Sequence, residues 1–358
     1  MALYDHVADL SLEVEGFDLT RHEMDTSAGF TRVTTVVELH GADAVGRGED
    51  VTYETEDHDA LHRAHDAGTL DWELAGSYTL DSLSSALDDR DLFPEPPEQE
   101  RFHRYRRWAV ESAALDLALR QADTDFAAAF DRTFDPVRFV VSTRLDTDGD
   151  PTADRVHRWL DVDPDLEFKL DPTSAWDRRL FDDLAGTDSV RILDFKNFYE
   201  GTDVDADPDP ALYRRAIDAL PDAILEDAKL TDGTREALAG VHDRLSWDYP
   251  VTDVASIRAL PVEPRWLNVK PSRFGTVESL LTAVEYCLDS GITMYGGGQY
   301  ELSVGREQLH ALASTFHPDG PNDVAPRAFN VPEPHDDVPT SPLQPAADPT
   351  GFAFSHSQ

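Results

Sequence analysis

Residues 190–196 read Val-Arg-Ile-Leu-Asp-Phe-Lys, an apolar run that ends in charged side chains. The recurrence of this pattern along the chain predicts the fold. Six similar runs occur between residue 135 and residue 300. The runs begin about 21 to 33 residues apart, which is the spacing of alternating strands and helices in βα units. We predict strands at residues 137–142, 166–171, 190–196, 223–226, 244–248, 266–270 and 291–295.

Helical patterns fill several of the stretches between these strands. In residues 277–288 the apolar side chains recur on one helical face, Thr276 can cap the start, and Gly291 can close the end. Seven βα units, with a weak eighth near residues 322–326, predict a (β/α)8-type barrel. An open doubly wound sheet is the less favoured alternative, because the first strand carries no glycine-rich phosphate loop.

The chain before the repeats has a mixed pattern. Residues 30–39 and 44–51 read as strands, whereas residues 57–67, 79–88 and 101–121 read as helices. We therefore predict an α+β capping domain at residues 1–130, a (β/α) barrel catalytic domain at residues 131–330, and a Pro/Asp-rich C-terminal tail at residues 331–358. The tail has no periodicity and is expected to be an extended or disordered arm.

The charge of the chain excludes some partners. The 358 residues include 31 basic and 71 acidic side chains, so the formal net charge is −40. This charge repels nucleic-acid phosphates and anionic lipid surfaces, and no apolar run is long enough to span a bilayer. The start of the chain lacks the pattern of an export signal, and one cysteine, Cys287, cannot form an internal disulfide. We expect a cytoplasmic protein.

Lysine is rare, and its distribution is uneven. The basic residues include only four lysines, and Lys169, Lys196, Lys229 and Lys270 all fall between residues 169 and 270. An acidic, lysine-poor composition resembles that of salt-adapted proteins of halophilic archaea, where molar salt screens charge repulsion. The clustering indicates a site that needs several ammonium groups, and a chance cluster of surface lysines is the alternative.

Three consecutive predicted strands end in a carboxylate. Asp194, Glu226 and Asp248 occupy these positions, and the carboxyl ends of barrel strands meet at one face. Convergent carboxylates repel each other unless a cation lies between them, and hard oxygen ligands suit Mg²⁺. Lys169 and Lys270 end the flanking strands. A lysine beside a divalent cation has a lowered pKa and can act as a general base, while the metal holds the enediolate formed from a substrate carboxylate.

These motifs resemble those of the enolase superfamily, in particular its mandelate-racemase and muconate-lactonizing branches. The order of three carboxylates followed by lysine on strands three to six carries the resemblance. Gly46-Arg47-Gly48-Glu49 resembles the end of the family's capping strand pair, and residues 109–116 resemble its Glu-x-Ala-x-x-Asp helix. Leu225-Glu226-Asp227 stands where the family has Glu-Glu-Pro, and Asn268-Val269-Lys270-Pro271 resembles its Lys-Pro strand end.

The resemblance implies a role for each matching residue. Asp194, Glu226 and Asp248 would bind Mg²⁺, Lys270 would be the acid/base catalyst, and Lys169 would match the first lysine of the family's Lys-x-Lys. This sequence departs from the family at the second lysine, where Asp171 stands, and it has Lys196 on the next strand instead. Lys196 can replace the missing charge, and Asp171 can itself be a base.

The departure bears on the reaction. Without the second lysine, a one-base elimination by a lyase of dehydratase type is favoured over a racemase/epimerase or cycloisomerase of the same superfamily. A Schiff-base aldolase using Lys270 is another alternative. A metal hydrolase is disfavoured because the strand ends carry no pairs of His, and a binding protein without activity on the same scaffold is the remaining class.

Further expectations concern the substrate and its surroundings. The substrate is expected to be a small-molecule carboxylate, with Asn268, Gly297, Gln299 and Glu301 as substrate-binding residues, and the protein is expected to be a homo-oligomer. By the same resemblance, the loops at residues 18–29 and 53–58 would close over the barrel mouth. Residues 146–150 resemble a calcium loop but lack its glycine and its closing glutamate, so we predict a polar turn there.

Overall fold

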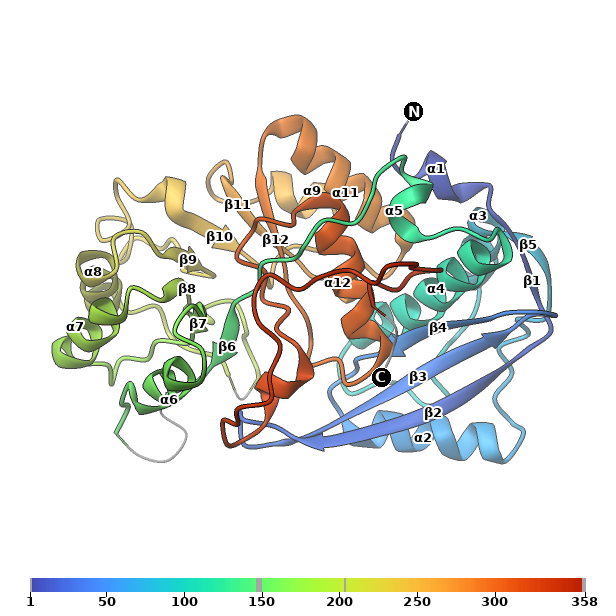
Figure 1. Cartoon of the computed structure of the whole chain (residues 1–358), viewed down its shortest axis with the longest axis horizontal. Helices are drawn as coiled ribbons and strands as arrows, with labels where there is room; N and C mark the ends of the chain where they lie inside the picture. Colours follow the sequence, from blue (N-terminus) through green and yellow to red (C-terminus); the bar gives the residue numbers. More distant parts are fainter. Residues whose placement is uncertain (1, 146–149, 203, 356–358) are drawn as a thin grey trace.

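The computed structural model describes residues 2–145, 150–202 and 204–355. The chain forms an N-terminal α+β domain beside a curled parallel sheet with helices around it (Figure 1). The polar turn predicted at residues 146–150 lies almost entirely outside the described residues. The strands and helices up to residue 130 are α1 Asp5–Ala8, β1 Ser11–Val14, β2 Gly16–Asp25, β3 Thr31–His40, β4 Val45–Asp50, α2 Thr55–Asp66, β5 Gly76–Thr79, α3 Leu80–Leu87, α4 Phe102–Gln121 and α5 Phe126–Ala129.

The N-terminal domain is built on an antiparallel sheet of order β2-β3-β4. Strand β3 is its central strand, and helices α4 and α2 pack on the sheet, as Figure 1 shows. Because both faces of β3 are covered, the strand consists largely of buried β-branched residues. Residues 18–29 were expected to be a loop, but most of them belong to β2, which pairs with β3 along its full length. The sequence of β2 hides this strand because an edge strand here buries few side chains.

The second half of the chain contains the predicted parallel strands. They lie side by side in sequence order in one seven-stranded sheet. The strands are β6 Val141–Thr143, β7 Phe168–Leu170, β8 Val190–Asp194, β9 Ile224–Glu226, β10 Leu245–Trp247, β11 Trp266–Val269 and β12 Thr293–Gly296. Residues 322 and 323 take the eighth position, since Asn322 bridges to Phe139 before β6 and Asp323 bridges to Gly297 after β12. The barrel-type fold that the spacing predicted is therefore confirmed.

Helices connect most of these strands and cover the outside of the sheet (Figure 1). They are α6 Asp154–Val162, α7 Arg178–Thr187, α8 Pro210–Ala219, α9 Val254–Arg258, α10 Pro271–Phe274, α11 Val277–Ser290 and α12 Val304–Phe316, with 3₁₀ turns η1 His242–Arg244 and η2 Arg327–Asn330. Helix α11 is capped as predicted, because the Thr276 hydroxyl accepts a hydrogen bond from the Ser279 N–H and Gly291 adopts the left-handed conformation. The link between β9 and β10 contains η1 and no α-helix.

Two carboxylates of the N-terminal domain hold the barrel helices. Glu49, at the end of β4, accepts hydrogen bonds from the backbone N–H groups of Leu302, Ser303 and Gly305, at the start of α12. Glu111, on α4, accepts one from the Val277 N–H at the start of α11. A carboxylate at a helix N-terminus satisfies free N–H groups and interacts favourably with the helix dipole. The two domains are thus joined by buried caps.

The glycines of the Gly-x-Gly-Glu motif allow this contact. A Cβ at Gly46 would lie 2.2 Å from the Ala113 carbonyl oxygen, and one at Gly48 would lie 2.0 Å from the Ala109 carbonyl oxygen. Both distances are far shorter than atoms allow, so only glycine lets α4 lie this close to β4. The close approach brings Glu49 and Glu111 to the barrel.

The C-terminal tail is extended and packed against the rest of the protein. It bridges to Val137 through Leu343, and Phe352 and Phe354 are almost fully buried. The Phe352 ring stacks on Phe126 with centroids 4.4 Å apart. Of the two expectations for the tail, an extended arm is the one the structure shows for residues 331–355.

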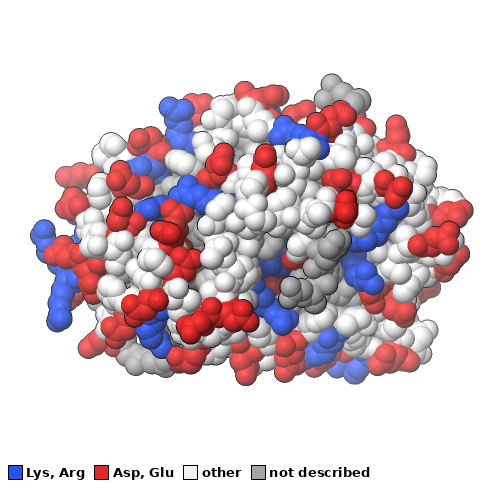
Figure 2. Space-filling model, in the orientation of Figure 1, with Lys and Arg blue, Asp and Glu red and all other residues white. Residues whose placement is uncertain are grey.

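Acidic side chains are scattered over the face of the molecule seen in Figure 2. Figure 2 shows Asp and Glu spread over the visible face, with Lys and Arg in smaller numbers among them. Among the described residues, no helix has both the length and the apolar character needed to cross a lipid bilayer.

The packed tail yields a prediction about stability. Phe352→Ala should lower the free energy of unfolding by about 3–5 kcal/mol, because truncating a buried aromatic leaves a cavity against Phe126. Leu288→Ala is the control: this side chain is 41% exposed, and its loss should change the free energy by no more than about 0.5 kcal/mol. Urea denaturation followed by circular dichroism measures both, and equal effects would contradict the docked tail.

Candidate active site

The three predicted strand-end carboxylates converge. Asp194 ends β8, Glu226 ends β9 and lies opposite Asp194 in the sheet register, and Asp248 follows β10 directly. Each side chain is fully buried, and one carboxylate oxygen from each lies within 4.8 Å of the others. The convergence follows from the parallel strands, whose carboxyl ends meet at one edge. The predicted meeting of these side chains is therefore observed.

Glu226 lies at the centre of the polar network. Its carboxylate accepts hydrogen bonds from Lys169 Nζ at 2.6 Å, from the Tyr295 hydroxyl at 2.5 Å, and from the Asn268 side-chain amide at 3.2 and 3.3 Å. Burial raises the pKa of Glu226 to about 8, and the charges of Asp194 and Asp248 act in the same direction, although Lys169 opposes them. With Lys169 already in contact, this carboxylate needs a further positive charge to be fully ionised at neutral pH.

Asp194 and Asp248 are ionised because cations face them. Burial opposes ionisation of Asp194, but Lys196 and Lys169 hold its pKa below the usual range. Asp248 lies 2.9 Å from Lys270 Nζ and 2.8 Å from Arg273 Nε. These two cations outweigh burial and keep the pKa of Asp248 low.

The donor set fits a divalent metal. Three buried carboxylates from three strands supply hard oxygen ligands at close range, which is the chemistry that Mg²⁺ prefers. At this separation, two like charges repel by roughly 3 kcal/mol at an effective dielectric constant of about 20. Lysines and an arginine supply the compensating charge in this structure. The residues present are therefore suitable ligands for Mg²⁺.

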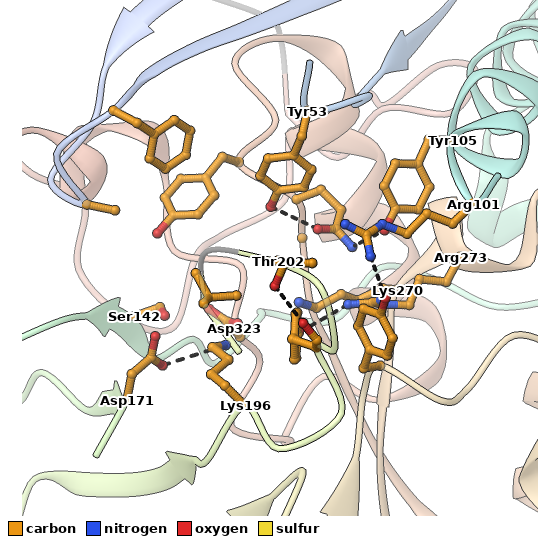
Figure 3. Close-up of a pocket in the computed structure, with 18 of the residues that line it drawn as sticks. Tyr53, Arg101, Tyr105, Ser142, Asp171, Lys196, Thr202, Lys270, Arg273 and Asp323 are labelled. Atoms are coloured by element: carbon orange, nitrogen blue, oxygen red, sulfur yellow. Dashed lines mark hydrogen bonds and ion pairs between the residues drawn. The ribbon is translucent and has the colours of Figure 1, made fainter. Parts of the chain in front are cut away.

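A cavity of about 630 Å³ opens between the barrel and the N-terminal domain, and its wall includes the lysines that contact the three carboxylates, not the carboxylates themselves. Lys169, Lys196 and Lys270 line it, so three of the four lysines of the chain face one cavity. The fourth, Lys229, instead forms an ion pair with Glu200. Asp171 lines the cavity too, and Figure 3 shows it directed toward Lys196, with Nζ and carboxylate oxygen 3.7 Å apart. The uneven lysine distribution thus marks a site.

The lysines differ in their contacts. Lys169 is 1% exposed and lies within 3.1 Å of carboxylate oxygens of Asp194, Glu226 and Asp323. Burial works against its charge, but these carboxylates raise its pKa well above the ordinary value. Lys270 contacts one carboxylate, that of Asp248.

The predicted substrate contacts divide into two groups. Gln299 lines the cavity, and its side-chain oxygen accepts a hydrogen bond from Tyr53 of the N-terminal domain at 3.0 Å. Asn268, Gly297 and Glu301 do not line the cavity, and their roles as substrate contacts stay predictions. Asn268 points to Glu226, and the Glu301 carboxylate turns back to the Gln299 N–H. Gly297 has space for no side chain, since a Cβ would lie 2.3 Å from Asn268 Oδ1.

Several polar side chains at the site were not predicted from the sequence. Arg273 lies one turn beyond Lys270, and its Nε is 2.8 Å from the Asp248 carboxylate. Tyr199 donates a hydrogen bond to the same carboxylate at 2.8 Å. Asp323 reaches Lys169 from the eighth barrel position. The signal for Arg273 was its place three residues after Lys270, whereas Tyr199 and Asp323 lie in segments without periodicity. Of the loops expected at the barrel mouth, Ala28 and Tyr53 contribute to the cavity wall.

Solved structures similar to the chain share its fold at low sequence identity. A member of the enolase superfamily from Listeria innocua is 17% identical with a TM-score of 0.66, over 88% of this chain and 86% of that one. A dipeptide epimerase from Methylococcus capsulatus, complexed with Mg ion, is 17% identical with a TM-score of 0.64, over 85% and 88%. A mandelate racemase/muconate lactonizing protein from Herpetosiphon aurantiacus is 16% identical with a TM-score of 0.65, over 96% and 98%.

These structures confirm the predicted fold, a barrel preceded by an α+β capping domain. No curated protein matches the chain. Residues 5–129 match the N-terminal domain, and residues 133–331 the C-terminal domain, of a family described as "Domain of unknown function (DUF8230)". The chain therefore belongs to the DUF8230 family, and its fold is that of the enolase superfamily.

Proposed function

We propose that this protein is a Mg²⁺-dependent enzyme that removes a proton from the carbon next to a substrate carboxylate. The observation that carries the proposal is the buried group of Asp194, Glu226 and Asp248 beside a cavity lined by three lysines. The fold supports it, because the similar structures include an epimerase complexed with Mg ion.

The contacts of each residue indicate its role in the proposed reaction. Asp194, Glu226 and Asp248 would hold Mg²⁺, which when bound supplies positive charge that stabilises the negative charge developing on the substrate carboxylate. Lys270 lines the cavity beside Asp248 and has the fewest carboxylate partners of the site lysines, so it would take the proton. Lys169, held by three carboxylates, would remain protonated and orient them. Asn268 and Tyr295 would fix the direction of Glu226 by hydrogen bonds.

Elimination is the reaction that we propose first. Asp171 stands where the resemblance places a second lysine. A lyase needs one base, Lys270, whereas a two-lysine racemase needs that missing lysine as well. An epimerase or racemase is the second candidate, and one observation favours it: Lys196 lines the same cavity from the end of β8, whereas Lys270 follows β11. Two amines at different sides of one carbon are what proton transfer between two faces needs.

Other expectations from the sequence stay predictions. These are a cycloisomerase or a Schiff-base aldolase as the reaction, assembly into a homo-oligomer, a cytoplasmic location, and adaptation to molar salt in a halophilic archaeon.

Metal binding is the first test. Isothermal titration in molar KCl should show one Mg²⁺ bound per chain, and Asp194→Asn and Asp248→Asn should each weaken binding by about tenfold or more because a charged ligand is lost. Asp289→Asn makes the same chemical change at an exposed position on α11 and should leave the affinity unchanged. Absence of Mg²⁺ binding to the wild-type protein would contradict the proposal.

Proton exchange is the second test. Candidate carboxylic acids are incubated in D₂O with Mg²⁺ and molar KCl, and deuterium at the α-carbon is measured by NMR. Lys270→Ala should lower the exchange rate by about 10² to 10⁴-fold, which is typical for loss of a general base. Lys229→Ala removes the lysine that pairs with Glu200 outside the cavity and should leave the rate unchanged. Exchange that persists in Lys270→Ala, or a borohydride-trapped adduct on Lys270, would overturn this assignment.

A further inference from the structure

The charge of the cavity differs from that of the surface. The described residues that line it include seven basic side chains and four acidic ones, in a chain whose net charge is −40. The basic residues are Arg101, Arg144, Lys169, Lys196, Lys270, Arg273 and Arg306. Such a cavity attracts anions.

Six of the seven cations already have a carboxylate partner. Arg144 pairs with Asp171 at 3.1 Å, and Arg306 lies 3.4 Å from Glu301. The remaining four pair with strand-end carboxylates, Lys169 and Lys196 with Asp194, and Lys270 and Arg273 with Asp248. Each of these six cations therefore has a carboxylate partner within the protein, although Asp194 and Asp248 are each shared by two.

Arg101 is the exception. It forms no ion pair with any carboxylate in the part of the chain that the structure describes, although the sequence contains 71 acidic residues. One of its terminal nitrogens donates a hydrogen bond to the Tyr249 hydroxyl, and its Nε is buried without a hydrogen-bond partner. Arg101 lines the cavity, so an anion at its guanidinium would gain a charge-assisted contact that no described carboxylate supplies.

The surroundings of Arg101 hold it in place. Its guanidinium lies 5.4 Å from the centroid of the Tyr249 ring, and Arg273 lies 4.9 Å from the same ring on its way to Asp248. Both guanidiniums therefore contact the Tyr249 ring, and Arg273 in addition reaches Asp248. Figure 3 shows Arg101 beside Tyr105 at one side of the cavity, away from Asp171 and Lys196 at the other.

We propose that Arg101 binds a second anionic group of the substrate, at the end away from the carbon that reacts. The substrate would then be a dianionic acid, with one carboxylate at the strand-end cluster and a second carboxylate or a phosphate at Arg101. This inference rests on the proposed function for the position of the first carboxylate. It makes Arg101 a specificity-determining residue supplied by the N-terminal domain, at the residue before helix α4.

Binding to the full-length protein tests the proposal. Dissociation constants are measured by isothermal titration, with and without Mg²⁺, for dicarboxylates from succinate to adipate, for monocarboxylates of equal carbon number, and for phosphonocarboxylates of matching length. One dianion of the series should bind about tenfold or more tightly than its monocarboxylate, the advantage expected from a charge-assisted hydrogen bond. The preference between the dicarboxylate and the phosphonate identifies the second group.

Three variants locate the effect. Arg101→Gln should abolish the preference for the dianion and leave monocarboxylate binding unchanged, whereas Arg101→Lys should keep part of it because the charge remains. Arg104→Gln is the matched control, since Arg104 is exposed three residues further along the same segment. Thermal unfolding of each variant verifies that it is folded.

The outcomes separate this inference from the proposed function. Equal affinities for dianions and monocarboxylates in the wild-type protein, or a preference that survives in Arg101→Gln, would overturn the role of Arg101 even if binding depends on Mg²⁺. A preference that Arg101→Gln removes, but that does not depend on Mg²⁺, would support the anion site and count against the metal-dependent function.

Discussion

The repulsion among three buried carboxylates is the constraint on which the rest of the site depends. Asp194, Glu226 and Asp248 are brought together by the parallel strands, and none of them is exposed to water. Their charges persist only where cations are supplied at contact distance. Lys169, Lys270 and Arg273 meet this need for Asp194 and Asp248, so the rare lysines of the chain are found where the carboxylates are. Glu226, whose pKa is raised to about 8 with these cations present, needs one further positive charge.

Two further buried carboxylates hold the N-terminal domain against the barrel and so make it part of the site. Glu49 and Glu111 cap barrel helices α12 and α11, so buried hydrogen bonds fix the orientation of the domain. Gly46 and Gly48 allow the approach, since a side chain there would collide with α4. With the domain fixed, Tyr53 and Arg101 reach the cavity from above the barrel mouth. Carboxylates thus serve two purposes here, as helix caps between the domains and as candidate metal ligands at the strand ends.

The candidate site was predictable where its charged residues stand at the ends of predicted strands. Asp194, Glu226 and Lys270 stand at the ends of apolar runs, and alternation of side chains along a strand sets which way they point. Tyr199 lies in a connecting segment, and Asp323 lies at the weak eighth barrel position, where too few residues repeat to predict a direction. Only folding places them beside Asp248 and Lys169. Asn268 was predicted to bind the substrate from its place beside the motif; its amide nitrogen donates a hydrogen bond to Glu226, and the substrate contact stays a prediction.

The sequence by itself determined the barrel-type fold, the identity of the three strand-end carboxylates and the group of lysines around them, because strand spacing and residue alternation are local properties of the chain. Which cation pairs with which carboxylate follows from the tertiary structure. The same is true of Arg101, which has no carboxylate partner among the described residues. Tertiary structure also decided that the tail packs through Phe352. These features depend on contacts between residues that are distant in the sequence, and such contacts leave no periodic signal.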